Sequence, residues 1–268
     1  MMRSEGDFGT KNLKSASTIV SFFRVKTIVN QQLVYIKCYN KRRNTSVLWG
    51  LIVKSSKEWF NYLLLALISF GCFFLEYLSI GIVFMIFGNL GVFEICIHLI
   101  LTSVLWIISI ALIIMFSKKY HNYPEQFNDN NPIKGKDWLI TLLCLLGCKV
   151  ITFIDWNSLK IVGEFQIKNL VYFAMQYSYY ICEIGLMCLI IVYGQKAFET
   201  LIRKSSVVPF GGVVLALTWG AVHFFSRGID IWNGLSCMIV SILSGIMYLR
   251  LKKNLGYSYI FIALGYLL

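Results

Sequence analysis

Long apolar runs occupy most of the chain from residue 60 onward, and short polar or basic segments separate them. A helix needs about 20 apolar residues to cross the hydrocarbon core of a bilayer. The pattern therefore predicts an all-α, polytopic transmembrane helix bundle of about seven helices. The predicted spans are Phe60–Phe87, Val92–Phe116, Trp138–Ile154, Leu170–Val192, Val207–Phe225, Ile231–Leu249 and a short final run, Tyr257–Leu268.

The hydrophobic pattern divides the chain into two parts. Residues 58–268 form the predicted bundle, whereas residues 1–57 mix apolar and basic positions without a long apolar run. We interpret 1–57 as a basic cytoplasmic segment. Its partial helical spacing is compatible with an amphipathic helix on the membrane surface, and equally with a poorly ordered leader.

Composition supports a membrane location. The chain is 57% hydrophobic and 14% charged, whereas soluble domains have about 25% charged residues. Of the 25 Lys and Arg residues, 21 fall on the side of the predicted bundle that holds the N-terminus and 3 on the other side. Positive residues mark the cytoplasmic side, so the N-terminus is predicted to be cytoplasmic. The net charge of +12 is then an orientation signal, compatible with contact with anionic lipid headgroups, and requires no nucleic acid. The predicted partner is the lipid bilayer.

Polar groups inside the predicted spans are the candidates for function, because ionisable residues there are costly and usually have a partner or a role. These residues are Glu76, Glu94, His98, Glu183 and His223. Glu94 and His98 are four residues apart on one helix face and are predicted to bond each other. A catalytic or proton-handling role for that pair is the alternative.

The sequence lacks the motifs of several common enzyme classes. The sequence contains no H-E-x-x-H, no G-x-S-x-G and no G-x-x-x-x-G-K-[ST], which argues against a zincin helix, a nucleophile elbow and a phosphate-binding loop. Cys144 and Cys148 share a helix face, but no third or fourth ligand for a soft metal is evident. The sequence therefore leaves cofactor and metal requirements open.

Two stretches in the last hundred residues carry a resemblance. "GQKAFETLIRKS" contains Glu199 and Arg203, and "TWGAVHFFSRG" contains Trp219 and His223. Over residues 165–268 this order resembles the CPBP family (CAAX protease and bacteriocin-processing, also called Abi) of intramembrane proteases. That family has the motifs E-E-x-x-x-R, [F/W]-x-x-x-H and a later H-x-x-x-[N/D].

The resemblance implies an intramembrane endopeptidase in which a glutamate and histidines activate water for hydrolysis of a peptide bond. The implied catalytic residues are Glu199 and His223, with Arg203 orienting the turn beside Glu199. The implied substrate is a membrane-associated peptide or protein. The implied location is a bacterial cell membrane, where family members are often linked to maturation of, or immunity to, secreted peptides.

The sequence also departs from the family pattern. Phe198 stands at the position of the first glutamate, and no histidine follows His223. Glu183 or Gln195 could replace the missing base. Glu183 lies about 24 Å from Glu199 along a straight helix, so both could act on one water only if the helix broke, for example near Gly194.

Three interpretations therefore remain. The first is a divergent, partly degenerate protease, which should place Glu199 and His223 within reach of one water. The second is a catalytically silent immunity or scaffold protein, in which His223 only holds two helices together. The third is a small transporter with Glu76, Glu94, His98 and Glu183 along a polar path, which should show broken helices and a polar cavity.

Overall fold

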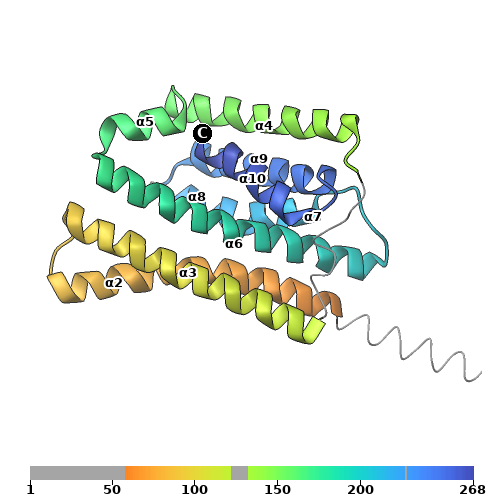
Figure 1. Cartoon of the computed structure of the whole chain (residues 1–268), viewed down its shortest axis with the longest axis horizontal. Coiled ribbons are helices and arrows are strands. Elements are labelled where there is room, and N and C mark those ends of the chain that lie inside the picture. The colour runs from red at the N-terminus through yellow and green to blue at the C-terminus, as the bar shows by residue number, and fades with distance from the viewer. Residues whose placement is uncertain (1–57, 122–131, 227) are drawn as a thin grey trace, which may run out of the picture. The chain divides into compact units, whose positions relative to one another are not determined.

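The computed structural model describes residues 58–121, 132–226 and 228–268, which are mainly helical and contain no β-strand (Figure 1). These residues form seven apolar helices when 135–167 and 210–226 are each counted as one helix with an interruption. The predicted all-α fold and the predicted helix number are therefore confirmed. The interpretation of residues 1–57 falls outside the described residues.

The helix bounds follow the apolar runs closely. Residues 58–71 are helical and continue through the 3₁₀ turn η1 (Cys72–Phe74) into α2 (Leu75–Phe87). The remaining elements, in chain order, are α3 (Val92–His121), α4 (Gly135–Trp156), α5 (Lys160–Ile167), α6 (Leu170–Ile202), α7 (Phe210–Leu215), the π-helix η3 (Ala216–Gly220), α8 (Ala221–Ser226), α9 (Ile231–Arg250) and α10 (Leu255–Leu267).

Helix α6 is the central element of the bundle. It packs against α3, α7 and α10, and 72% of its most apolar window is buried, compared with 22% in each of the first three long helices. All 33 residues of α6 are helical, so the helix does not break near Gly194. Glu183 and Glu199 therefore stay on one continuous helix.

The segment predicted as the fifth span is shorter than expected and is interrupted. It runs over Phe210–Ser226, with α7 and α8 on either side of η3. Small residues bring α7 close to α9: an added Cβ on Gly212 would lie 2.9 Å from the Cα of Gly245. Substitution there would force these two helices apart.

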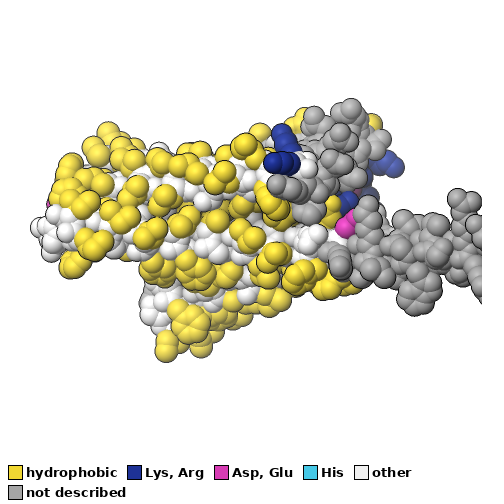
Figure 2. Space-filling model, turned by 90° about the horizontal axis from the view of Figure 1, so that it is seen from below, with side chains coloured by type: hydrophobic (Ala, Val, Ile, Leu, Met, Phe, Trp, Pro, Cys, Tyr) yellow, Lys and Arg dark blue, Asp and Glu magenta, His cyan; other side chains and the backbone are white. Residues whose placement is uncertain are grey.

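Five of the seven helices are long and apolar enough to cross a membrane, and Phe210–Ser226 and Leu255–Leu267 are shorter apolar helices. Large hydrophobic side chains cover the visible sides of the helices, and Lys and Arg side chains gather at one end (Figure 2). An apolar surface of this extent indicates contact with hydrocarbon rather than water.

Candidate functional site

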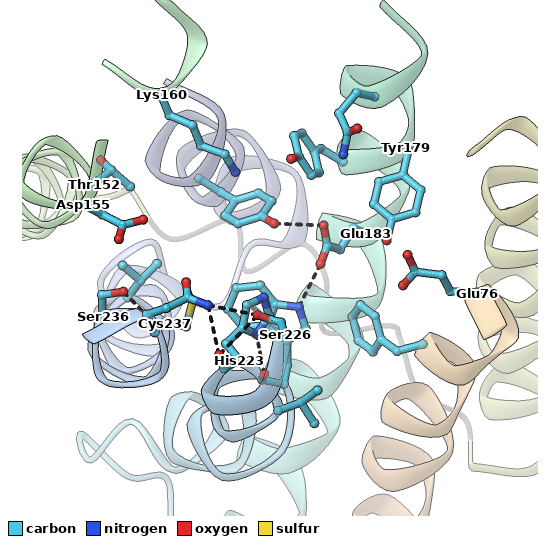
Figure 3. A pocket seen from close by; sticks show the side chains of 18 of the residues that line it. Glu76, Thr152, Asp155, Lys160, Tyr179, Glu183, His223, Ser226, Ser236 and Cys237 are labelled. Carbon is cyan, nitrogen blue, oxygen red and sulfur yellow. Dashed lines mark hydrogen bonds between the residues drawn. The ribbon is translucent and has the colours of Figure 1, made fainter. Parts of the chain in front are cut away.

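A cavity of about 490 Å³, here called the inner pocket, lies between the helices of the bundle (Figure 3). Its lining comes from residues 58–74 and from α2, α4, α5, α6, η3, α8, α9 and α10. The pocket therefore sits where most of the fold converges. Its polar lining side chains include Glu76, Thr152, Asp155, Lys160, Glu164, Gln176, Glu183, His223, Ser226, Asn233 and Ser236.

Glu183 of α6 links three helices at the wall of this pocket. Its side chain is buried, and the Trp219 indole donates to Oε1 at 2.9 Å while the Tyr266 hydroxyl donates to Oε2 at 3.0 Å. Both donors are neutral groups. A carboxylate has about four lone-pair sites, so each oxygen can accept a further hydrogen bond from a group inside the pocket.

His223 of α8 lies beside the same indole. Its ring centroid is 4.2 Å from that of Trp219, and its Nδ1 lies 2.8 Å from the Trp219 carbonyl oxygen. Since a carbonyl oxygen can only accept, Nδ1 carries the hydrogen in this contact. From α9, the Asn233 amide donates to the His223 carbonyl and to the Ser226 hydroxyl, each at 2.9 Å. Helices α8 and α9 are thereby fixed against each other at the pocket.

The short helix α5 contributes a lysine and a glutamate that are both buried. The Lys160 ammonium lies 4.2 Å from the Tyr180 ring centroid and 3.9 Å from that of Tyr266. Glu164 Oε1 accepts from the Tyr180 hydroxyl at 2.9 Å and lies 3.6 Å from the Lys168 ammonium. Within the described part of the chain, Glu164 Oε2 is buried without a hydrogen-bond partner.

Sequence reasoning missed this pair, because residues 155–169 were treated as a connection between two spans. The signal that could have identified it is the spacing: Lys160 and Glu164 are four apart and share a helix face. The two hydrophobic residues between them, Ile161 and Val162, also fit a short helix.

The structure places Glu199 outside the inner pocket, near the C-terminal end of α6. Lys253 donates to its Oε2 at 2.6 Å, and Gln195 and the Ser206 amide donate to its Oε1 at 2.9 and 3.1 Å. Glu199 is not among the pocket-lining residues, whereas Glu183 and His223 both are. The structure thus brings Glu183, not Glu199, into the same pocket as His223.

The other residues of the motif around Glu199 have local contacts. Arg203 ends α6 in the left-handed conformation with φ of 54°, and its side chain is exposed. Phe198 stacks on Phe210 with ring centroids 4.5 Å apart. The side-chain Oε1 of Gln195 accepts from the Gly211 backbone amide at 3.0 Å. These contacts join α6 to the segment that starts α7.

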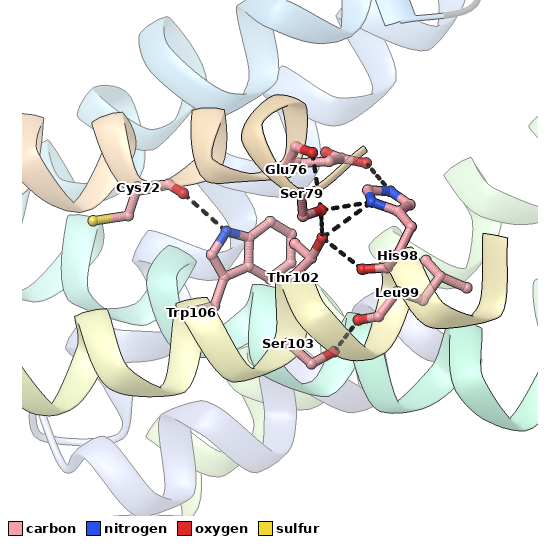
Figure 4. Close-up of polar contacts among 8 residues, drawn as sticks. All are labelled: Cys72, Glu76, Ser79, His98, Leu99, Thr102, Ser103 and Trp106. Carbon is pink, nitrogen blue, oxygen red and sulfur yellow. Dashed lines mark hydrogen bonds and ion pairs between the residues drawn. The ribbon is translucent and has the colours of Figure 1, made fainter. Parts of the chain in front are cut away.

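The predicted pairing of His98 with Glu94 is wrong. His98 Nδ1 lies 2.6 Å from the Ser79 hydroxyl, and its Nε2 lies 3.8 Å from Glu76, so both partners come from α2 (Figure 4). The spacing of four on α3 allowed a local bond, but the crossing of α2 and α3 offers closer partners. Because Glu76 also lines the inner pocket, the His98 cluster adjoins the pocket wall.

Among the residues that the structure describes, no group of three or more His, Cys, Asp or Glu side chains is arranged to hold a metal ion. Cys144 and Cys148 are both buried and belong to the main hydrophobic core. Comparison of the chain with protein-family models, curated proteins and solved structures found no match in any of the three. The resemblance over residues 165–268 therefore stays a prediction.

Proposed function

We propose that the chain is a multi-pass protein of the bacterial cell membrane that binds a small polar solute in the inner pocket and carries it across the bilayer. The observation that supports this proposal is a charged cavity of about 490 Å³ inside a bundle of apolar helices. Ligand pockets typically measure about 300–1,000 Å³. Buried carboxylates in such a bundle are costly unless they have a function.

Interrupted helices at the pocket support transport in particular. Phe73 and Phe74 of η1 and Trp219 of η3 all line the cavity. Transporters typically bind solutes where spanning helices are broken, because the breaks supply polar groups and allow local movement. π-helical turns are also frequent at functional sites. The transporter interpretation required both features, a polar cavity and broken helices.

The distribution of basic residues supports an orientation for this pocket. Trp156 and Ser226 line the cavity and end α4 and α8, just before the connections that are poor in Lys and Arg. With the N-terminus in the cytoplasm, as the positive-inside rule favours, these connections face outward. We propose that the solute enters from the extracytoplasmic side.

Uptake into proteoliposomes tests the proposal. The purified chain would be assayed with panels of labelled amines, amino acids, carboxylates and sugars. We expect one class to enter faster than into protein-free liposomes, and this uptake to be lost in Glu183→Gln. Glu94→Gln is the matched control, because Glu94 does not line the pocket. Absence of uptake for every class by folded, inserted protein would contradict the proposal.

A second candidate is an intramembrane peptidase of the CPBP type in which Glu183 takes the role first assigned to Glu199. Glu183 and His223 both contact Trp219 and line one cavity. A glutamate and an imidazole around one water are suited to general base catalysis and to stabilising an oxyanion.

Cleavage of membrane-anchored peptides in liposomes separates this candidate from the first. It requires that Glu183→Gln and His223→Ala abolish cleavage while Glu199→Gln, if folded, retains it. If Glu199→Gln abolished cleavage and Glu183→Gln retained it, Glu199 would be the catalytic glutamate, as the resemblance implies. The immunity and scaffold interpretations stay predictions.

A further inference from the structure

We infer that the solute of the inner pocket is an organic ammonium ion, and that Lys160 occupies the ammonium site from within the chain until the solute displaces it. This inference rests on the proposed function and names its ligand class. It is carried by three features of the described residues: an aromatic cage around Lys160, a buried acceptor without a partner, and an excess of acidic over basic lining residues.

The aromatic cage is the first feature. Lys160 is only 7% exposed, and its ammonium lies 3.9 Å from the ring centroid of Tyr266 and 4.2 Å from that of Tyr180. Cations bind aromatic faces within about 6 Å because the ring face carries negative potential. A site that holds one alkylammonium group in this way has the chemistry to hold another of similar size.

The hydroxyls of the two cage tyrosines strengthen this chemistry. Tyr180 donates to Glu164 Oε1 at 2.9 Å, and Tyr266 donates to Glu183 Oε2 at 3.0 Å. The hydroxyl of each ring is therefore hydrogen-bonded to a carboxylate. Hydrogen bonding to a carboxylate polarises the phenol and makes its ring face more attractive to a cation.

Glu164 supplies the second feature. It lines the pocket and is 2% exposed, and none of the described residues gives its buried Oε2 a hydrogen bond. A buried acceptor of this kind is costly unless a donor reaches it. The N–H groups of a primary amine are such donors, and a charged donor gives the stronger bond to a carboxylate.

The charge of the lining is the third feature. Among the described residues, the acidic side chains that line the pocket are those of Glu76, Asp155, Glu164 and Glu183. The basic side chains in the lining are only those of Lys160 and His223. Lys168 lies 3.6 Å from Glu164 Oε1 and is not itself a lining residue. Such a lining disfavours an anionic solute, because like charges repel strongly away from bulk water.

Helix α5 makes the displacement of Lys160 mechanically simple. It is eight residues long and is joined to α4 and α6 by the connections at 157–159 and 168–169. Lys160 is its first residue, so its side chain can leave the cage through movement at the end of a short helix. A tethered group competes with dissolved ligand at an effective concentration of the order of millimolar.

Binding to the purified full chain in nanodiscs of phosphatidylethanolamine and phosphatidylglycerol tests this inference. The probes are phenethylamine and tetramethylammonium, with 2-phenylethanol, phenylacetate and sodium chloride as matched neutral, anionic and inorganic probes. We expect calorimetry to detect the two ammonium compounds and none of the others. Glu164→Gln should weaken phenethylamine binding roughly tenfold or more, and Glu94→Gln should leave it unchanged.

Lys160→Met tests the self-occupied site. Removing the tethered competitor should tighten ammonium binding about tenfold; unchanged affinity would overturn this part of the inference. Reductive methylation of wild-type protein provides a second measurement that needs no variant. Bound tetramethylammonium should increase methylation of Lys160, because the displaced ammonium becomes accessible, whereas reduced methylation would show that the ligand binds elsewhere and covers the lysine.

The outcomes also separate this inference from the proposed function. Binding of phenylacetate or 2-phenylethanol, but of neither ammonium compound, with loss in Glu183→Gln would overturn the ligand class and keep a solute pocket. Binding of sodium alone would overturn it as well. Binding of no probe, together with no uptake of any solute class, would overturn both proposals.

Discussion

Glu183 and Glu199 stand on the same continuous helix, α6, yet their surroundings differ in the charge of their partners. Glu199 pairs with the Lys253 ammonium and also accepts from Gln195 and the Ser206 amide. Glu183 accepts from the neutral Trp219 and Tyr266 side chains at the pocket wall. One carboxylate is paired with a cation within the fold, and the other lies at the wall of a cavity.

This difference indicates what each region does. A carboxylate that is paired and hydrogen-bonded within the fold contributes to stability, and its loss leaves a cation without its partner. A carboxylate that shares a cavity with other acidic groups contributes little to folding and is available to a ligand. Glu199→Gln should therefore affect mainly stability, and Glu183→Gln mainly solute uptake.

The largest effect on stability is expected at Gly211, where α7 packs against α6 close to Glu199. An added Cβ at Gly211 would collide with the backbone of Ile191, and the Gly211 amide donates to Gln195. Gly211→Ala should lower the free energy of unfolding by about 1–3 kcal/mol through overpacking. Equilibrium unfolding in mixed micelles would measure this change in free energy. Gly81→Ala is the control, because nothing lies within 4 Å of its added Cβ; an equal loss there would refute the packing argument.

The second-largest loss of stability is expected when Glu199 is neutralised. Glu199→Gln removes the charge that faces Lys253 and places an amide donor opposite existing donors. We expect the free energy of unfolding to fall by about 2 kcal/mol, with solute uptake by the folded fraction unchanged. The same measurement on Lys253→Met and on the double variant gives the coupling energy. A coupling near zero would show that the pair does not stabilise the end of α6.

The matched substitution at the pocket should have the smallest effect on stability. Glu183→Gln keeps an acceptor oxygen for the Trp219 indole, and its amide can donate to the Tyr266 hydroxyl, which can turn from donor to acceptor. The free energy of unfolding should change by about 1 kcal/mol, while solute uptake is lost. A drop in stability as large as that of Glu199→Gln, with uptake retained, would reverse the comparison between the two glutamates.

Much of the fold could be predicted from the sequence, because the length of an apolar run determines whether a helix can cross a bilayer. The runs starting at Val92, Leu170 and Ile231 begin at the same residues as α3, α6 and α9. The π-helical interruption at Ala216–Gly220 could not be predicted, because the residues directly on either side of it are apolar and it contains no proline.

The candidate site was only partly predictable. The cost of an ionisable group in a span identified Glu76, Glu183 and His223, and all three line the inner pocket. Spacing within one helix gave the wrong partner for His98, because tertiary partners come from a different helix. The buried Lys160 was counted as a loop residue, since sequence alone does not reveal that a short connecting helix turns inward.

Chemical modification of Cys237 tests most directly whether the inner pocket is selective for cations and is reached from the extracytoplasmic side. Cys237 lines the pocket, whereas Cys188 is buried in the core. Chains retaining only one of these cysteines would be treated in intact bacterial cells with membrane-impermeant trimethylammonium and sulfonate methanethiosulfonates. Each rate would be normalised to the reaction of that reagent with dissolved cysteine.

We expect the cationic reagent to modify Cys237 at least about tenfold faster than the anionic one, because acidic lining residues concentrate cations. Cys188 should react with neither reagent, and prior addition of tetramethylammonium should slow the reaction at Cys237. Equal normalised rates for the two reagents would contradict cation selectivity, and no modification of Cys237 from outside the cell would contradict a pocket that is reached from that side.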